Sequence, residues 1–283
     1  WMAILFFFFF QAVSYEYRKK QNNLFGSRMY EVFLYINGSV GIVLIGIALG
    51  TLFTGGNFIK NDMNLSAWTT HTYGLEGALH PFNVALGFTI FFLGRVQASL
   101  YFINNIDDDA IVRNAKTQLL RDALLFVGFF VAMTVMLLVM SGVSYHHTLF
   151  FVSEYKFLYN FLASPILIAF FLLGTLLVLY AIVSTLVRNS KKGIWFSGIG
   201  SILVTLSLFC LLGFNYTSIY PSLSDLSSSL TIENSSASHY TLRTMGYVSL
   251  GIPFVLAYIF IVWKAMDRQK ITSDEIHSDP HHY

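Results

Sequence analysis

Long apolar stretches are the feature that most constrains what this chain can fold into. Six of them are long enough to cross a lipid bilayer, which takes about 20 residues in a helix. Backbone polar groups surrounded by lipid must pair within their own segment, so each stretch is expected to be a helix. The predicted spans cover residues 30–54, 79–103, 123–145, 160–187, 194–219 and 244–266. The sequence therefore predicts an all-α, polytopic transmembrane helix bundle that forms one integral membrane domain over residues 1–283.

The composition agrees with a chain that is solvated mainly by lipid. Of its 283 residues, 55% are hydrophobic and only 11% are charged, whereas a soluble domain carries about 25% charged residues. The formal net charge of +2 is too small to indicate a nucleic-acid partner. The single cysteine, Cys210, excludes an internal disulfide and a metal site built on paired cysteines.

A seventh apolar run, residues 1–13, is too short to be a complete span. A helix of that length covers roughly 20 Å, against about 30 Å of hydrocarbon, and the polar run 14–20 follows it directly. We therefore expect a partial N-terminal span that lacks its beginning. The alternative is a short span through a thin bilayer, with Trp1 as an anchor at the membrane interface.

The basic residues alternate along the chain. Thirteen of the 17 Lys and Arg residues follow the short first run or the second, fourth and last full spans. The other connections hold only Lys60, Lys156 and Arg243. This alternation is the positive-inside pattern, and it predicts that the C-terminus and the tail 267–283 are cytoplasmic. Residues 106–122 are expected to form a short cytoplasmic helix ahead of the third span.

One charged residue, Arg95, is expected within a span. It lies about eight residues, roughly 12 Å, from the cytoplasmic end of its predicted helix. Its side chain either forms an ion pair with a carboxylate on a neighbouring helix or subunit, or extends toward the cytoplasmic interface. No Asp or Glu is expected deep in any of the six spans, so a relay of protons through this segment of chain has no carboxylate to use.

Small and polar residues in the spans indicate helix packing. Gly46 and Gly50 form a small-xxx-small pair, which allows the backbones of two helices to approach closely. Of the histidines, only His80 lies near a span, at its outer mouth, where a hydrogen-bonding cap is a commoner role than a haem ligand. Further polar residues are expected to make interhelical hydrogen bonds, namely Asn37, Asn83, Gln97, Thr134 and Asn160.

The sequence shows no phosphate-binding loop, nucleophile motif or metal-ligand spacing. We therefore assign no catalytic residue and no metal ligand. One alternative function is that of a secondary transporter or permease, since Pro81, Pro165 and Pro253 could interrupt spans as transporter helices are interrupted. Pro81 and Pro165 lie close to span starts, however, where proline does not disturb a helix.

Several segments, taken in order, resemble one known family. Residues 220–266 resemble the C-terminal signature of subunit II of bacterial cytochrome bd-type quinol oxidases: an aromatic-Pro step, a Ser-x-Leu-Thr run, an Asn-small-Ser stretch and a last span ending in Trp-Lys. The matching residues here are Tyr220 with Pro221, 229–231, 234–236, and Trp263 with Lys264. The run "FFQAVSYEYRKK" resembles the family's apolar-aromatic run that closes on a Tyr-Arg-x-Lys cytoplasmic loop, here through Tyr17, Arg18 and Lys20. "LHPFN" stands where the family has Asn-Pro-Phe, so His80 is a departure.

The resemblance implies a function for the whole assembly. Subunit II of such oxidases is a haem-free partner in a heterodimer, and subunit I holds the quinol site together with haem b and haem d. The complex oxidises quinol and reduces dioxygen to water in the bacterial inner membrane. The resemblance further implies that subunit II stabilises subunit I and contributes to proton access, that some members hold a structural quinone in subunit II, and that two and a half N-terminal helices of the family precede residue 1.

Overall fold

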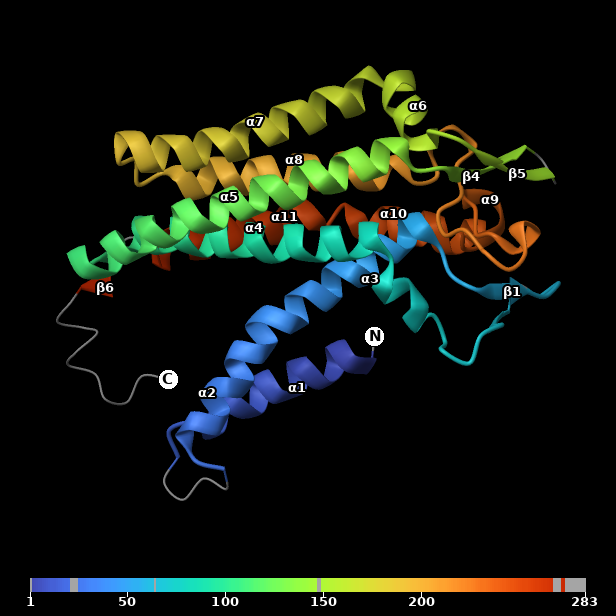
Figure 1. Cartoon of the computed structure of the whole chain (residues 1–283). Coiled ribbons are helices and arrows are strands. Elements are labelled where there is room, and N and C mark those ends of the chain that lie inside the picture. Colours follow the sequence, from blue (N-terminus) through green and yellow to red (C-terminus); the bar gives the residue numbers. More distant parts are fainter. Residues whose placement is uncertain (1, 21–24, 64, 147–148, 267–270, 273–283) are drawn as a thin grey trace.

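The structure is a computed structural model that describes residues 2–20, 25–63, 65–146, 149–266 and 271–272 (Figure 1). Its longer helices are α1 (Met2–Tyr17), α2 (Ser27–Ile36), α3 (Ile42–Thr54), α4 (Pro81–Asn105), α5 (Asp109–Val139), α6 (Lys156–Ala163), α7 (Pro165–Arg188), α8 (Gly193–Leu211), α10 (His239–Ser249) and α11 (Ile252–Met266). A short helix, α9 (Ile232–Ser235), lies in the connection before α10. A π-helical turn, Asn37–Gly41, joins α2 to α3 in one continuous helix.

Short strands lie in the connections between helices, and they pair with one another. Strand β1 (Phe58–Lys60) pairs antiparallel with β2 (Ser66–Trp68), and β4 (Gly142–His146) pairs antiparallel with β5 (Leu149–Ser153). Strand β3 (Ile106–Asp107), in the turn between α4 and α5, pairs in parallel with β6 (Ile271–Thr272). Apart from β6, the predicted tail 267–283 lies outside the described residues, as does Trp1.

The all-α polytopic fold is confirmed. Among the described residues, six helical stretches are long and apolar enough to cross a membrane: Ser27–Thr54, Pro81–Asn105, Asp109–Val139, Pro165–Arg188, Gly193–Cys210 and His239–Met266. Helix α1 is a shorter apolar helix. The positions of all six follow the hydropathy of the sequence, because burial of apolar side chains in lipid needs only length and composition.

The bundle is built from α3, α4, α5, α7 and α8. Helix α7 packs mainly on α8, α5 packs on α4, and α3 crosses α4 on its other side. Helices α1 and α2 form a hairpin that diverges from the other helices, whereas α10 and α11 run along the bundle (Figure 1). No residue of α10 or α11 is buried within the described chain.

The two ends of the bundle differ in character. We call one the basic end, because α4, α7 and α11 finish there and α5 and α8 begin there, and it carries Arg113, Lys116, Arg188, Lys191, Lys192 and Lys264. We call the other the loop end, which holds β1, β2, β4, β5 and residues 212–238 (Figure 1). The alternation of basic connections along the sequence thus gathers the basic residues at one of the two ends of the bundle.

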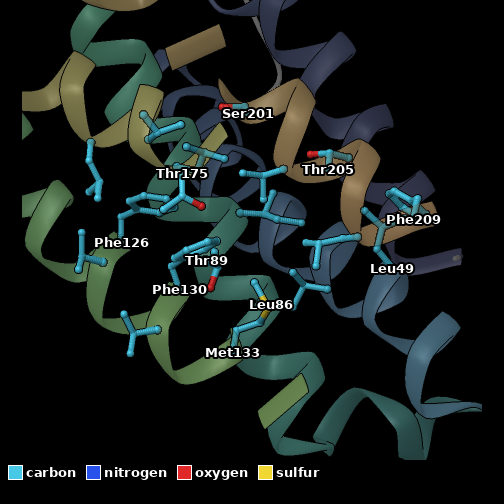
Figure 2. A pocket seen from close by; sticks show the side chains of 18 of the residues that line it. Leu49, Leu86, Thr89, Phe126, Phe130, Met133, Thr175, Ser201, Thr205 and Phe209 are labelled. Atoms are coloured by element: carbon cyan, nitrogen blue, oxygen red, sulfur yellow. The ribbon is translucent and has the colours of Figure 1, made fainter. Parts of the chain in front are cut away.

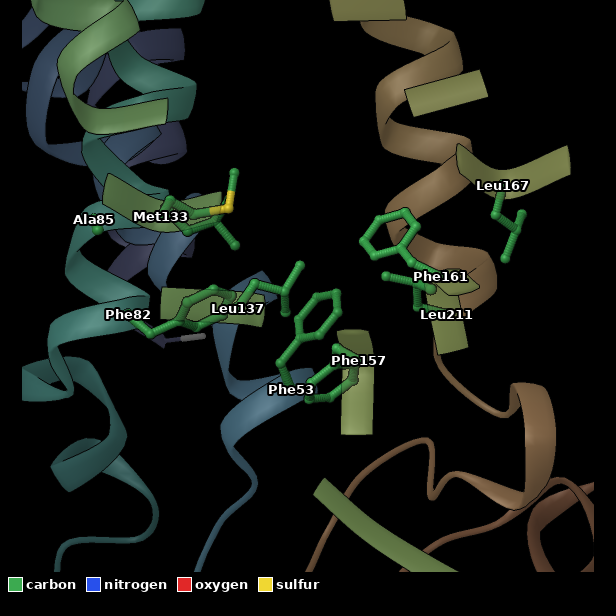
Figure 3. Packing of buried hydrophobic residues seen from close by; sticks show 10 residues of the cluster. Phe53, Phe82, Ala85, Met133, Leu137, Phe157, Phe161, Leu167 and Leu211 are labelled. Carbon is green, nitrogen blue, oxygen red and sulfur yellow. The ribbon is translucent and has the colours of Figure 1, made fainter. Parts of the chain in front are cut away.

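Two clusters of buried apolar side chains form the core. The first lies toward the loop end, where Phe53 contacts Phe82 and Phe157 at ring-centroid distances of 5.7 and 5.5 Å (Figure 3). The second lies toward the basic end and includes Val96, Leu119 and Ala181, each completely buried. Together the clusters hold α3, α4, α5, α7 and α8 in register along their length.

The ends of two expected spans differ from the ends of the helices in the structure, because hydropathy does not report backbone conformation. The predicted span 123–145 and the predicted cytoplasmic helix 106–122 are one helix, α5, and residues 142–145 belong to strand β4 instead. The predicted span 194–219 ends at Leu211, soon before Gly213, whose φ of 76° is left-handed. That conformation suits glycine and terminates a helix.

Two further spans are interrupted beside prolines. The predicted span 160–187 consists of α6 and α7, which meet at Ser164 in an extended conformation (φ −127°, ψ 91°). Pro165 disfavours the helical conformation at the residue before it and has no N–H to continue the ladder. The predicted span 244–266 begins earlier, at His239, where the Ser238 side chain caps α10, and it is interrupted between α10 and α11 just before Pro253.

Candidate functional site

An apolar cavity lies inside the bundle, between α3, α4, α5, α7 and α8 (Figure 2). Its volume is about 190 Å³, and Phe, Leu and Val side chains make most of its wall. The wall also includes the hydroxyls of Thr89, Thr175, Ser201 and Thr205. Those of Thr89, Thr175 and Ser201 each donate to a carbonyl of their own helix, at 2.8, 2.8 and 2.7 Å. The cavity therefore suits a mainly apolar guest, because its wall is mostly hydrocarbon and three of its four hydroxyl donors are already engaged.

Arg95 forms an ion pair inside the bundle. Its Nε lies 3.0 Å from Oδ2 of Asp122 on α5, and its guanidinium lies over the Phe91 ring at 5.6 Å from the centroid. The Asp122 side chain is 6% exposed, whereas that of Arg95 is 37% exposed. Arg95 lies ten residues before the end of α4 at Asn105, or about 15 Å along the helix. Of the two roles open to Arg95, the structure gives it the ion pair with a neighbouring helix.

The expectation that no carboxylate lies deep in a span is wrong for Asp122. The sequence predicts Asp122 as the last residue of a cytoplasmic helix, one residue before the expected span. Helix α5 is continuous from Asp109, so Asp122 lies about three and a half turns inside it. A signal was available in the sequence, since an Arg within one span calls for a carboxylate on a neighbouring one.

Gly46 and Gly50 lie against α4. A Cβ atom built on Gly46 would meet Cα of Gly87 at 2.6 Å, and one on Gly50 would meet Oδ1 of Asn83 at 2.5 Å. Neither position has room for a side chain without separation of the two helices. Asn83, at the same crossing, donates from Nδ2 to the Thr54 hydroxyl at 2.9 Å and to the Gly77 carbonyl at 2.8 Å.

The other polar residues of the spans also bond between segments, with one exception. Asn37 donates to Gln11 of α1 at 2.6 Å, and Gln97 donates to Ser201 of α8 at 2.7 Å. Asn160 donates to the Thr217 hydroxyl at 2.7 Å and to the Leu211 carbonyl at 3.2 Å, where α8 ends. Thr134 instead donates to the Phe130 carbonyl of its own helix, at 2.8 Å.

His80 occupies the residue before the first turn of α4. Its backbone carbonyl accepts from the Val84 N–H at 3.0 Å, and among the described residues its imidazole makes no capping hydrogen bond to the helix. The side chain is exposed at the loop end, away from the apolar cavity, whose wall it does not line. The structure therefore places His80 apart from both the cavity and the ion pair.

The loop end contains an ordered polar network around Glu76. Its carboxylate accepts from the Thr72 hydroxyl, from the Asn57 amide at 2.9 Å and from the Thr70 hydroxyl at 2.8 Å. These bonds, first of all that from Thr72, lower the pKa of Glu76 from 4.5 to about 2. A carboxylate that accepts several hydrogen bonds stays ionised at acid pH. Glu76 thus fixes the connection between β2 and α4.

Residues of the C-terminal signature build the connection before α10. Thr231 and Asn234 form a reciprocal capping box, with the Thr231 N–H donating to Asn234 Oδ1 at 2.8 Å. Ser229 accepts from the Ser222 N–H at 3.0 Å, and Tyr220 stacks on Phe58 of β1 at 5.4 Å. These residues serve to fold the loop end, which the sequence pattern alone did not reveal.

Among the described residues, no group of three or more His, Cys, Asp and Glu side chains could hold a metal ion. The fold and these sites define a multi-pass membrane protein whose interior is packed around an apolar cavity and one ion pair. Over residues 1–266 the sequence matches the profile of the cytochrome bd terminal oxidase subunit II family, and the chain belongs to that family.

Individual relatives support this family assignment. The chain is 23% identical over 287 aligned positions to cytochrome bd-I ubiquinol oxidase subunit 2 of Escherichia coli K12, covering 96% of this chain and 74% of the relative. The proteins of the same description from strains O6:H1 and O157:H7 give the same identity and coverage.

Proposed function

We propose that this chain is the haem-free subunit II of a cytochrome bd quinol:oxygen oxidoreductase of the bacterial inner membrane. The family match over residues 1–266 carries the proposal. In the complex, the haem-bearing subunit I oxidises quinol and reduces dioxygen to water. This chain stabilises subunit I and contributes to proton access, and is not itself catalytic. The distribution of basic residues supports an orientation in which the basic end and the C-terminus face the cytoplasm.

The described cavity wall supports the haem-free role. Haem iron is held by His, Cys, Met or Tyr side chains, and of these types only Met133 lines the cavity. The described histidines, His71, His80, His146 and His239, lie in the segments of the loop end or at the start of α10. Haem b and haem d therefore belong to the partner in this proposal.

The surface of α10 and α11 supports a partner subunit. Both helices are exposed along their whole length, and large apolar side chains such as Phe254, 78% exposed, and Tyr258, 67% exposed, project from them. Helix α1 likewise exposes a series of Phe side chains. A heterodimer with subunit I covers part of this apolar surface, and membrane lipid covers the rest.

The apolar cavity is also where a structural quinone would lie. Its phenylalanine and aliphatic wall suits the isoprenoid chain of a quinone better than the ring, because three of its four hydroxyls, those of Thr89, Thr175 and Ser201, donate to their own helices. The mostly apolar wall of the cavity also disfavours the transporter alternative, which requires polar groups that converge on a substrate near the bilayer midplane.

Purification through a tag on the full-length chain tests the proposal. We expect the tagged chain to bring with it a partner with the absorbance of haem b and haem d, and the purified complex to consume dioxygen when quinol is supplied. Two results together would contradict the proposal. The chain would be recovered without a haem-bearing partner, and deletion of its gene would leave the quinol oxidase activity of the membranes intact.

A further inference from the structure

The last membrane span is interrupted near its middle. Helix α10 ends at Ser249 and α11 begins at Ile252, within the apolar stretch His239–Met266. Pro253 lies about midway between the two ends of this stretch. A stretch of this length crosses the hydrocarbon of a bilayer, so the interruption lies near the midplane, where backbone groups have no water to bond to.

The interruption leaves two backbone carbonyls without the helical hydrogen bond that each would otherwise accept. Pro253 has no N–H, so it cannot donate to the Ser249 carbonyl four residues before it. The Phe254 N–H, which would serve the Leu250 carbonyl, donates instead to the Gly251 carbonyl at 3.1 Å. Among the hydrogen bonds of the described residues at this interruption, none ends on the Ser249 or Leu250 carbonyl. We call these two carbonyls the midspan acceptors.

The rest of the described chain does not cover the midspan acceptors. Every residue of α10 and α11 is exposed, and the ring contact of Trp263 with Trp195 of α8 lies far from the interruption, at the basic end. The acyl chains of lipids have no N–H or O–H group, so lipid alone would leave both carbonyls unpaired inside the bilayer, which is unfavourable. A protein partner that supplies a hydrogen-bond donor satisfies them.

The donor on the partner is expected to be uncharged. Helices α10 and α11 contain no Asp or Glu, and their basic residues Arg243 and Lys264 lie near the two ends of the span. A Lys or Arg side chain at the midspan acceptors, or a metal cation bound to them, would have no carboxylate on this span to balance its charge. A hydroxyl or carboxamide side chain supplies an O–H or N–H without a charge.

Small residues share the helical face of Pro253. Gly246, Ser249 and Ala257 lie seven or four residues from Pro253 along the chain, and these spacings place residues on one side of a helix. A Cβ atom built on Gly246 meets nothing within 4 Å, so no described atom of this chain fills the space beside it. Such a face lets a second helix approach closely, which brings a short polar side chain of that helix within reach of the midspan acceptors.

We propose that the midspan acceptors are a contact site for a transmembrane helix of the partner subunit, which donates a hydrogen bond to them from a hydroxyl or carboxamide side chain. This inference rests on the proposed function, in which the partner is the haem-bearing subunit I, and it assigns a specific contact within the exposed surface of α10 and α11. It requires a polar residue near the middle of one helix of subunit I. Lipid covers the opposite face of the span, which includes Val248.

Substitution of Pro253 tests the hydrogen bond. Pro253→Ala restores an N–H that can donate to the Ser249 carbonyl within the span, so the donor of the partner loses an acceptor. The complex that contains the full-length chain is purified in mild detergent and diluted, and its dissociation is followed by the haem absorbance that stays with the tagged chain. We expect the dissociation constant to rise about three- to tenfold.

Gly246→Leu tests the close approach of the partner helix. This chain accommodates the new side chain, since the space beside Gly246 is open, whereas a partner helix packed there must move away. The dissociation constant should therefore rise here as well. Val248→Leu is the matched control, because Val248 lies on the opposite face of α10 and is 71% exposed, and it should leave the dissociation constant unchanged.

The outcomes separate the inference from the proposed function. Equal dissociation constants for the unmodified chain, Pro253→Ala and Gly246→Leu would overturn the inference and leave the proposed function intact. An unmodified chain that is recovered without any haem-bearing partner would contradict the proposed function, and the inference with it.

A second measurement keeps Pro253 and Gly246 in place, so that it does not depend on the folding of those variants. A photoreactive diazirine residue replaces either Leu250, beside the midspan acceptors, or Val248, and the two side chains are 68% and 71% exposed in this chain. Irradiation of native membranes should cross-link the first position to subunit I and the second to lipid. Cross-linking of both positions to lipid, or of the first to a second copy of this chain, would overturn the inference.

Discussion

Arg95 and Asp122 show at the scale of single residues how a charge is accommodated inside the bundle. Replacing Arg95 with Leu leaves the 6%-exposed Asp122 carboxylate without its partner. Breaking a fully buried pair costs about 3–5 kcal/mol, and the partial exposure of Arg95 reduces this to roughly 1–3 kcal/mol. We expect Arg95→Leu to lower the melting temperature in detergent, as followed by tryptophan fluorescence.

The double variant Arg95→Leu with Asp122→Leu is the control for that prediction. Removing both charges leaves no unpaired carboxylate, so the double variant should be more stable than Arg95→Leu alone. If the two substitutions lower the melting temperature additively, the ion pair makes no contribution to the stability of the α4–α5 contact.

Glu76 makes the stability of the loop end depend on pH. Its pKa is about 2 in the folded protein, against 4.5 as the ordinary value. Because the folded pKa is the lower one, ionised Glu76 stabilises the fold above about pH 4.5, and this stabilisation is lost as the pH falls toward about 2. Glu76→Gln should therefore lower the melting temperature at about pH 7 and have a smaller effect at about pH 3.5.

The exposed carboxyl of Glu154, at the same end, provides the comparison. We expect Glu154→Gln to change the melting temperature little at either pH. A difference between the unmodified protein and Glu76→Gln that stays constant from neutral to acid pH would show that the hydrogen bonds to Glu76 do not stabilise its charged form.

At the scale of helices, the crossing of α3 over α4 depends on the absence of side chains at Gly46 and Gly87. Gly46→Leu introduces a side chain whose Cβ would lie 2.6 Å from Gly87 Cα, so α3 must move away from α4. Overpacking of this kind typically costs about 1–3 kcal/mol. We expect a lower melting temperature and a loss of hydrogen-exchange protection along α3, which contributes Phe53 to the first cluster.

Gly94→Leu is the matched control on α4, because nothing lies within 4 Å of a Cβ atom built there. It should leave stability unchanged or raise it slightly, since the helix propensity of leucine is higher than that of glycine. Equal destabilisation by Gly46→Leu and Gly94→Leu would mean that the close approach at Gly46 does not set the distance between α3 and α4.

The existence of the helices could be predicted from the sequence, but several of their ends could not. Hydropathy over a window reports burial in lipid, so it located all the long apolar helices. It does not report conformation, so it missed the break at Ser164 and the helix end before Gly213. The position of Asp122 inside a helix is not predictable for a related reason: a charge beside an apolar run usually marks the boundary of a span, whereas α5 continues through it.

The interior sites were partly visible in the sequence. The interhelical roles of Asn37, Gln97 and Asn160 followed from the cost of leaving an amide unpaired in lipid, and the structure supplies the partner of each. The apolar cavity was not visible, because a gap between helices depends on how side chains from separate segments meet, here five of them. Tertiary packing, which a single helix does not determine, decides where such gaps lie.

At the scale of the whole molecule, most buried polar side chains of the described residues are hydrogen-bonded within the chain, with the hydroxyls of Thr185 and Ser197 as exceptions. Many large apolar side chains stay exposed, among them those of α1, α10 and α11. In the proposed heterodimer these exposed apolar side chains meet subunit I and lipid, and the redox groups lie on the other side of the interface. The central claim is therefore one of division of labour: this chain supports the haem-bearing subunit and holds no haem.

The most direct measurement is the visible absorbance spectrum of each subunit after the purified complex, containing the full-length chain, is separated under mild conditions. The account predicts that all haem b and haem d absorbance stays with the partner, and that this chain shows none. A haem absorbance band that remains with this chain, bound by its own side chains, would contradict it.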